Sequence, residues 1–239
     1  MLILITIAAF VFTILGGLFA LRLKDRLHLV LGFSAGAIIA VAFFDLLPEA
    51  LELAGGTFET ATILTLTAIG FAAYLLLDRF VLLHTHMEEG RGENVLRATT
   101  GAGSLSLHSF LDGIGIGLAF QVSPAVGLVV AAAVLAHDFS DGINTVNMIL
   151  KNGGTRARAL RWLAVDAVAP VLGVISTMFF TVPAEKLGLL LALFAGFFLY
   201  IGASDLIPES HHSHPTRWTT VATIVGIATL YVVIKVAGV

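Results

Sequence analysis

Long apolar stretches alternate with short polar connections along the whole chain. There are eight such stretches, and each is long enough to cross a bilayer as a helix, for which about 20 residues suffice. Runs such as 129–135 do not alternate between apolar and polar residues, which excludes the strands of a membrane β-barrel. The pattern predicts an all-α integral membrane protein with eight transmembrane helices at about 2–21, 28–52, 60–83, 96–121, 124–150, 160–181, 187–208 and 217–238.

Composition agrees with a chain solvated by lipid. Of the 239 residues, 58% are hydrophobic and 12% are charged, against roughly 25% charged in an average soluble domain. The connections leave no room for a separate soluble domain, so we expect one transmembrane domain over residues 1–239. A net charge of -3 gives no support to nucleic-acid binding. Because the chain has no cysteine, disulfides and thiolate metal sites are excluded.

Basic residues fall mainly on one side of the predicted helices. Eleven of the 13 Lys and Arg lie in or beside the odd-numbered connections, and the other two are Lys186 and Lys235. By the positive-inside rule these connections are cytoplasmic. We therefore expect both termini to be extracytoplasmic, in a multi-pass protein of the plasma or inner cell membrane.

Two short patterns each occur twice, in helices of opposite direction. Asp45-Leu-Leu-Pro-Glu49 ends the second helix, and Asp205-Leu-Ile-Pro-Glu209 ends the seventh. HSFLDG at 108–113 in the fourth helix matches HDFSDG at 137–142 in the fifth. Repeats of opposite orientation are typical of transporters whose binding site lies near the bilayer midplane.

The second pattern carries the chemistry. His108 and Asp112 are four residues apart and share one helix face, as do His137 and Asp141. If the two helices are neighbours, two imidazoles and two carboxylates converge. Two nitrogen and two oxygen ligands suit Zn(II), and Fe(II), Mn(II), Co(II) and Cd(II) accept the same donors.

Two further carboxylates lie at membrane depth, Asp138 in the fifth helix and Asp166 in the sixth. Each charge at the bilayer centre costs about 2.5 to 3.5 kcal/mol on insertion scales, so Asp112, Asp138, Asp141 and Asp166 together need roughly 10 kcal/mol of compensation. No Lys or Arg lies deep enough in these helices to supply it. Protons or metal ions remain, and several metal sites sharing ligands would fit.

Polar clusters near the helix ends are candidates for the entrance and the exit of ions that reach such a site. Asp45 and Glu49 form an external entrance in this interpretation. The candidate cytoplasmic exit consists of Asp205, Glu209, His211, His212 and His214, although such a tract can equally be a solvated loop. A weaker candidate for metal delivery is the third connection, with His84, His86, Glu88 and Glu89.

These motifs resemble the ZIP family (Zrt- and Irt-like proteins) of divalent-metal transporters. The resemblance rests on the motifs HSFLDG, HDFSDG, DLLPE and LYIGASDLIPE at 199–209, and it covers nearly the whole chain. It implies inward transport, most simply of zinc, by alternating access. It also implies inverted repeats of helices 1–3 and 6–8 around helices 4 and 5, with helices 1, 4, 5 and 6 moving against helices 2, 3, 7 and 8, and a homodimer.

The resemblance further implies a binuclear metal centre. His108, Asp112, His137 and Asp141 would form the primary site. A second site sharing the bridging carboxylates would add Ser109, Asp138 and Asp166. The family commonly has Asn at the position of Ser109 and Pro-Glu-Gly where this chain has Leu-Asp-Gly and Ser-Asp-Gly. These differences bear on the second site and on metal preference.

Two other function classes fit parts of the pattern. An intramembrane zinc hydrolase would use His and Asp ligands with a metal-bound water, but it normally keeps an open position and a general base, which two equivalent motifs do not suggest. A proton-coupled carrier or channel would use the aspartates as a relay and the histidines structurally.

Overall fold

The structure, a computed structural model, describes residues 1–21, 28–84, 93–211 and 217–237, and these residues form helices and no strands. Eight helical spans are long and apolar enough to cross a membrane, which confirms the all-α membrane fold. The elements are α1 (Leu2–Ala20), α2 (His28–Val41), η1 (Ala42–Leu46), α3 (Leu47–Ala54), α4 (Thr60–His84), α5 (Glu93–Val122), α6 (Pro124–Lys151), α7 (Arg156–Thr177), α8 (Ala184–Tyr200), η2 (Ile201–Leu206), α9 (Ile207–His211) and α10 (Arg217–Ala237). Helices suit lipid because every backbone polar group is bonded within its own segment.

The sixth span differs most from the hydropathy pattern. It begins at Arg156 and ends at Thr177, four residues earlier at each end than the apolar stretch 160–181 indicates. The side chain of Thr155 accepts a hydrogen bond from the backbone nitrogen of Arg158 and so caps the helix. The basic first turn is therefore helical, although its charges give it the composition of a connection.

The repeated Asp-Leu-X-Pro-Glu patterns have the same local backbone. Each contains the end of a π-helical segment, η1 in the second span and η2 in the seventh, and each segment ends two residues before a proline. Proline lacks the N–H that continues a helix and its ring clashes with the carbonyl four residues earlier, and a wider turn relieves both problems. The two segments match although their sequences lie about 160 residues apart.

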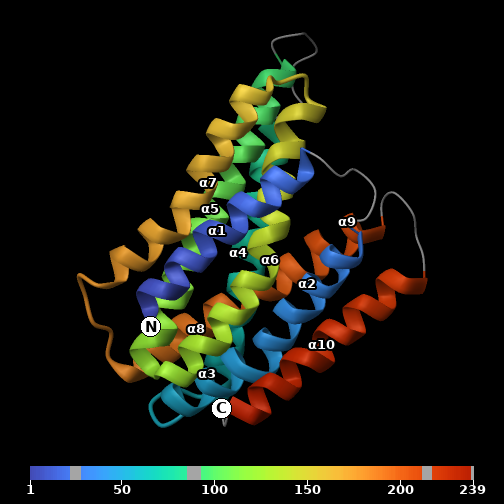
Figure 1. Ribbon diagram of the computed structural model, residues 1–239. Coiled ribbons are helices and arrows are strands. Elements are labelled where there is room, and N and C mark those ends of the chain that lie inside the picture. Colours follow the sequence, from blue (N-terminus) through green and yellow to red (C-terminus); the bar gives the residue numbers. More distant parts are fainter. Residues whose placement is uncertain (22–27, 85–92, 212–216, 238–239) are drawn as a thin grey trace.

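The spans form two groups, shown in Figure 1. Helices α1, α5, α6 and α7 contact one another, with α1 against α6 and α5 against α7. In the second group α2 packs against α10 and α4 against α8. The groups meet mainly where α2 contacts α6 and α5 contacts α8.

A pair of glycines marks each of the four main crossings. A Cβ on either glycine would overlap the carbonyl oxygen of the residue three positions before the other glycine, so only glycine permits this approach. Two of these close approaches occur where a glycine directly follows Asp112 or Asp141. The pairs are Gly16 and Gly142 (α1–α6), Gly113 and Gly173 (α5–α7), Gly36 and Gly226 (α2–α10), and Gly70 and Gly196 (α4–α8).

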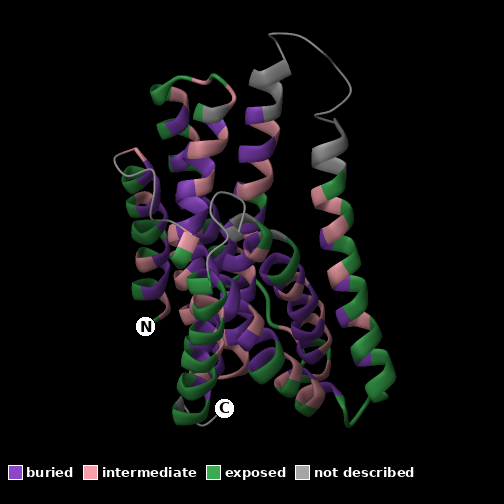
Figure 2. Cartoon of the chain, turned by 90° about the vertical axis from the view of Figure 1, so that its right-hand side faces the viewer, coloured by how far each residue is buried: buried purple, intermediate pink, exposed green. Residues whose placement is uncertain are grey.

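Burial reverses the pattern of a soluble protein. Figure 2 shows exposed residues on the outer faces of the helices. Many of them are large and apolar, whereas the aspartates and histidines of the fourth to sixth spans are buried. In the apolar window of α6, 72% of the residues are buried, against 28% in α1, so α6 is the central helix. The polar residues of α6 therefore face protein rather than lipid.

Candidate metal centre

Helices α5 and α6 are brought together by a tight reversal. Only Ser123 separates them; its side chain accepts a hydrogen bond from the backbone nitrogen of Val126, and Pro124 occupies the first position of α6. Proline suits this position because the first N–H groups of a helix have no partner within it. The two helices consequently run antiparallel and in contact, with their motif faces toward each other.

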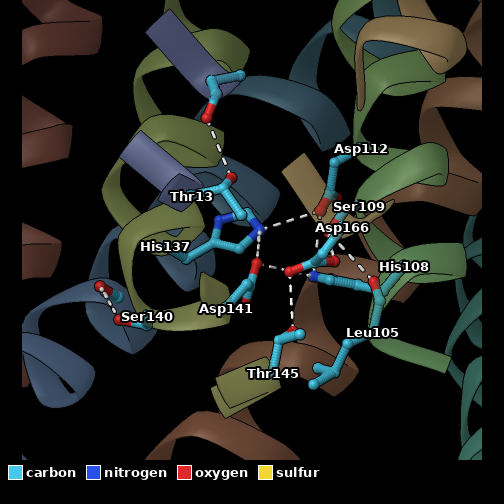
Figure 3. Close-up of polar contacts among 12 residues, drawn as sticks. Thr13, Leu105, His108, Ser109, Asp112, His137, Ser140, Asp141, Thr145 and Asp166 are labelled. Carbon is cyan, nitrogen blue, oxygen red and sulfur yellow. Dashed lines mark hydrogen bonds and ion pairs between the residues drawn. The ribbon is translucent and has the colours of Figure 1, made fainter. Parts of the chain in front are cut away.

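His108, Asp112, His137 and Asp141 converge from these two helices, as Figure 3 shows. One ligand atom from each lies within 4.8 Å of the others. The Oδ2 atom of Asp112 is 3.1 Å from Nε2 of both histidines, and that of Asp141 is 3.6 Å from both. A tetrahedral ion with ligands at about 2.0 to 2.2 Å separates its ligand atoms by about 3.3 to 3.6 Å. The four nitrogen–oxygen separations are thus close to those that such an ion requires.

The four side chains are at most 5% exposed. The ring of His137 is oriented by its own helix, since Nδ1 donates to the carbonyl oxygen of Ala133 at 2.9 Å. This arrangement leaves Nε2 directed at the carboxylates, as a metal-binding imidazole requires. Asp141 Oδ2 has no hydrogen-bond partner among the described residues, so it keeps a free lone pair.

Beside this cluster Asp166 accepts two hydrogen bonds. Ser109 donates to one carboxylate oxygen and Thr145 to the other, both at 2.9 Å. Sequence reasoning missed Thr145, although its position four residues after Asp141 on the same face of α6 could have indicated it. Asp166 is wholly buried and adjoins the four-residue cluster through Ser109, the residue next to His108.

Asp138 is the least satisfied group in this region. It is wholly buried, and neither carboxylate oxygen has a hydrogen-bond partner in the described part of the chain. A buried carboxylate without donors is costly unless a proton or a cation occupies it. Its ligand atoms do not belong to the four-residue cluster.

The candidate entrance residues lie outside the cluster. Asp45 is in η1, is 3% exposed, and has no hydrogen-bond partner on either oxygen among the described residues. Glu49 follows one turn later in α3 and is half-buried. The pair therefore remains a separate acidic position in the second span.

The candidate cytoplasmic residues are described only in part. Asp205 belongs to η2, and Glu209 and His211 belong to α9, while His212 and His214 lie outside the described residues. In the third connection His84 ends α4, and His86, Glu88 and Glu89 also fall outside the described ranges.

A family model described as ZIP zinc transporter matches residues 85–234, which is more than half of the chain and includes the four-residue cluster. The chain belongs to the ZIP zinc transporter family. This confirms the family that the motifs resemble, and it favours a transporter over an enzyme.

Similar proteins with names also support the family, since they are zinc transporters by name. The chain is 26% identical to zinc transporter ZupT of Corynebacterium aurimucosum over 220 residues, covering 84% of this chain and 82% of ZupT. It is 24% identical to zinc transporter YKE4 of Saccharomyces cerevisiae over 227 residues, covering 81% of this chain and 65% of YKE4. Identity to human zinc transporter ZIP6 is 33% over 108 residues, 45% of this chain but 14% of ZIP6. The chain therefore spans a small part of ZIP6 and most of ZupT.

Proposed function

We propose that this member of the ZIP family carries a divalent transition metal, most readily zinc, into the cytoplasm by alternating access. The observation that carries the proposal is the buried cluster of His108, Asp112, His137 and Asp141, whose nitrogen–oxygen separations of 3.1 to 3.6 Å suit the ligands of one ion. Carboxylates replace the water of the incoming ion, and imidazoles favour borderline metals over Mg(II) and Ca(II). Fe(II), Mn(II), Co(II) and Cd(II) are secondary substrates in this proposal.

Alternating access is supported by the paired construction of the fold. Under an inverted repeat, the first span (α1) corresponds to the sixth (α7). The second span (α2) corresponds to the seventh (α8), and the third (α4) to the eighth (α10). The contact of α1 with α6 then corresponds to that of α7 with α5, and the contact of α2 with α10 to that of α8 with α4. Each contact has its glycine pair, and both π-helical segments fall at matching places. We infer that the group of α1, α5, α6 and α7 moves against the group of α2, α4, α8 and α10, which are spans 1, 4, 5 and 6 against spans 2, 3, 7 and 8.

We propose a second metal site beside the first, formed by Ser109, Asp138 and Asp166 with the shared carboxylates. The unpartnered oxygens of Asp138 support it. The hydrogen bonds that Asp166 accepts from Ser109 and Thr145 occupy part of its acceptor capacity, so we propose that this second site is the weaker one. Asp45 and Glu49 would admit the ion, and Asp205, Glu209 and the histidines at 211, 212 and 214 would release it.

The distribution of basic residues supports an orientation with both termini outside, in the plasma or inner cell membrane. An even number of candidate spans agrees with both ends lying on the same side of the membrane. We propose a homodimer as the assembly, by analogy with the family.

The intramembrane hydrolase is the less favoured alternative. Four protein ligands would fill a tetrahedral zinc ion and leave no position for a reactive water. A proton-coupled carrier without metal would not require two imidazole nitrogens at ligand spacing from the same carboxylate.

Competition for zinc uptake tests the proposed substrate class. In proteoliposomes containing the purified protein, Cd(II) and Co(II) at tenfold excess are expected to inhibit zinc uptake strongly, because both accept imidazole and carboxylate ligands. Mg(II) and Ca(II) at the same excess are expected to have little effect. Equal inhibition by all four ions would contradict a site that uses histidine nitrogen.

A further inference from the structure

The two histidines of the cluster are oriented by different parts of the molecule. The Nδ1 atom of His137 donates to Ala133 in its own helix. The Nδ1 atom of His108 instead lies 2.7 Å from the hydroxyl oxygen of Tyr74, which belongs to α4 in the other group of helices. Nothing in the motifs around His108 indicates this partner, which is 34 residues away in sequence.

The direction of the Tyr74 hydrogen bond follows from the chemistry of the site. The Nε2 atom of His108 faces Asp112 at 3.1 Å and Asp141 at 3.6 Å, so Nε2 is the ligand atom. A nitrogen that binds a metal uses its lone pair, and the ring proton of the neutral imidazole then resides on Nδ1. That proton is donated to the Tyr74 oxygen, which fixes both the tautomer and the plane of the ring.

Tyr74 is itself held in place. Its side chain is 9% exposed, and its ring lies 5.4 Å from that of Tyr200 and 5.8 Å from that of Phe197 between ring centres. The hydroxyl of Tyr200 donates to Asp78 at 2.8 Å, which links α8 back to α4. The hydroxyl of Tyr74 is therefore presented to the site from a rigid aromatic cluster.

We propose that Tyr74 is a positioning residue that sets metal affinity through His108. The proposal rests on the proposed function of the four-residue cluster as the substrate site. Because α4 and α5 belong to different groups of helices, the orientation of His108 depends on how the two groups sit against each other. Helix α6 also receives a hydrogen bond from the second group, from Ser34 to the carbonyl of Ala136, but that bond holds backbone and not the His137 ring. The ring of His137 also packs against Phe198 of α8, at 6.3 Å between ring centres, but its Nδ1 hydrogen bond lies within α6. His108 is thus the ligand whose ring hydrogen bond depends on how the two groups sit.

The test compares two tyrosine-to-phenylalanine variants of the purified protein by isothermal titration with zinc. Tyr74→Phe keeps the ring and removes only the hydroxyl, and zinc affinity is expected to fall about 10- to 100-fold, as for other outer partners of metal-binding histidines. Tyr231→Phe removes an exposed hydroxyl from α10, outside this aromatic cluster, and is expected to bind zinc like the unaltered protein. Both variants are expected to unfold at similar temperatures when zinc is absent.

A double variant separates positioning from general stability. In a His108→Ala background, adding Tyr74→Phe is expected to cause no further loss of zinc affinity, because the ring that Tyr74 orients is gone. The same loss in both backgrounds, or an equal loss in Tyr231→Phe, would overturn the role of Tyr74. By contrast, an affinity that His108→Ala alone leaves unchanged would contradict the proposed substrate site itself.

Discussion

Replacing Asp112 by Asn is expected to weaken zinc binding by at least about 100-fold. Loss of a residue that only hydrogen-bonds to a metal ligand typically lowers metal affinity about 10- to 100-fold. The Oδ2 atom of Asp112 lies 3.1 Å from Nε2 of both histidines, so this oxygen is common to both halves of the cluster. An amide has nearly the same shape but no negative charge to offset that of the cation in a buried site. Titration of the purified variant with zinc measures the change.

The matched control is also a carboxylate-to-amide substitution, at a residue outside the cluster. Glu52 is exposed in α3 and is not one of the cluster residues. Glu52→Gln is expected to bind zinc with unchanged affinity. If Asp112→Asn bound zinc as tightly as Glu52→Gln does, Asp112 would not be a ligand and the primary site would have to lie elsewhere.

Gly142→Ala is expected to disrupt the centre through helix packing. A Cβ at Gly142 would overlap the carbonyl oxygen of Thr13 and lie 2.9 Å from the nitrogen of Gly17, so α1 must move away from α6. Overpacking of this kind costs about 1 to 3 kcal/mol, and here it acts one residue from Asp141. We expect both a lower unfolding temperature in detergent and weaker zinc binding.

Gly103→Ala in α5 is the comparison. The nearest atoms to a Cβ there are those of the Trp162 ring, at 3.7 Å, which is an ordinary contact. This variant is expected to unfold and bind zinc like the unaltered protein. Equal stability of Gly142→Ala and Gly103→Ala would show that the α1–α6 crossing tolerates a larger separation than the structure implies.

The convergence of the two motifs could be predicted because it depends on local rules. The spacing of four residues places His108 above Asp112 and His137 above Asp141, and a connection of a few residues forces their helices to be antiparallel neighbours. No property of the distant chain is needed to bring these four side chains together. The family could be inferred for the same reason, since the motifs are contiguous in sequence.

Features that depend on distant partners, or on local signals with more than one meaning, could not be predicted. Tyr74 lies in an apolar helix with no motif around it, and its role arises only from how α4 packs against α5. The π-helical segments have a proline signal, but a proline can equally end or kink a helix. The start of α7 was missed because three arginines in its first turns have the composition of a connection, whereas the Thr155 cap makes them helical.

Uptake of zinc by proteoliposomes tests the central claim most directly. The unaltered protein, Asp112→Asn and His137→Ala are reconstituted at equal density, after each is shown to be folded by its unfolding temperature in detergent. The account predicts saturable uptake by the unaltered protein and none above empty liposomes for either variant. A folded, unaltered protein that binds zinc stoichiometrically but moves none across the bilayer would contradict transport through this cluster.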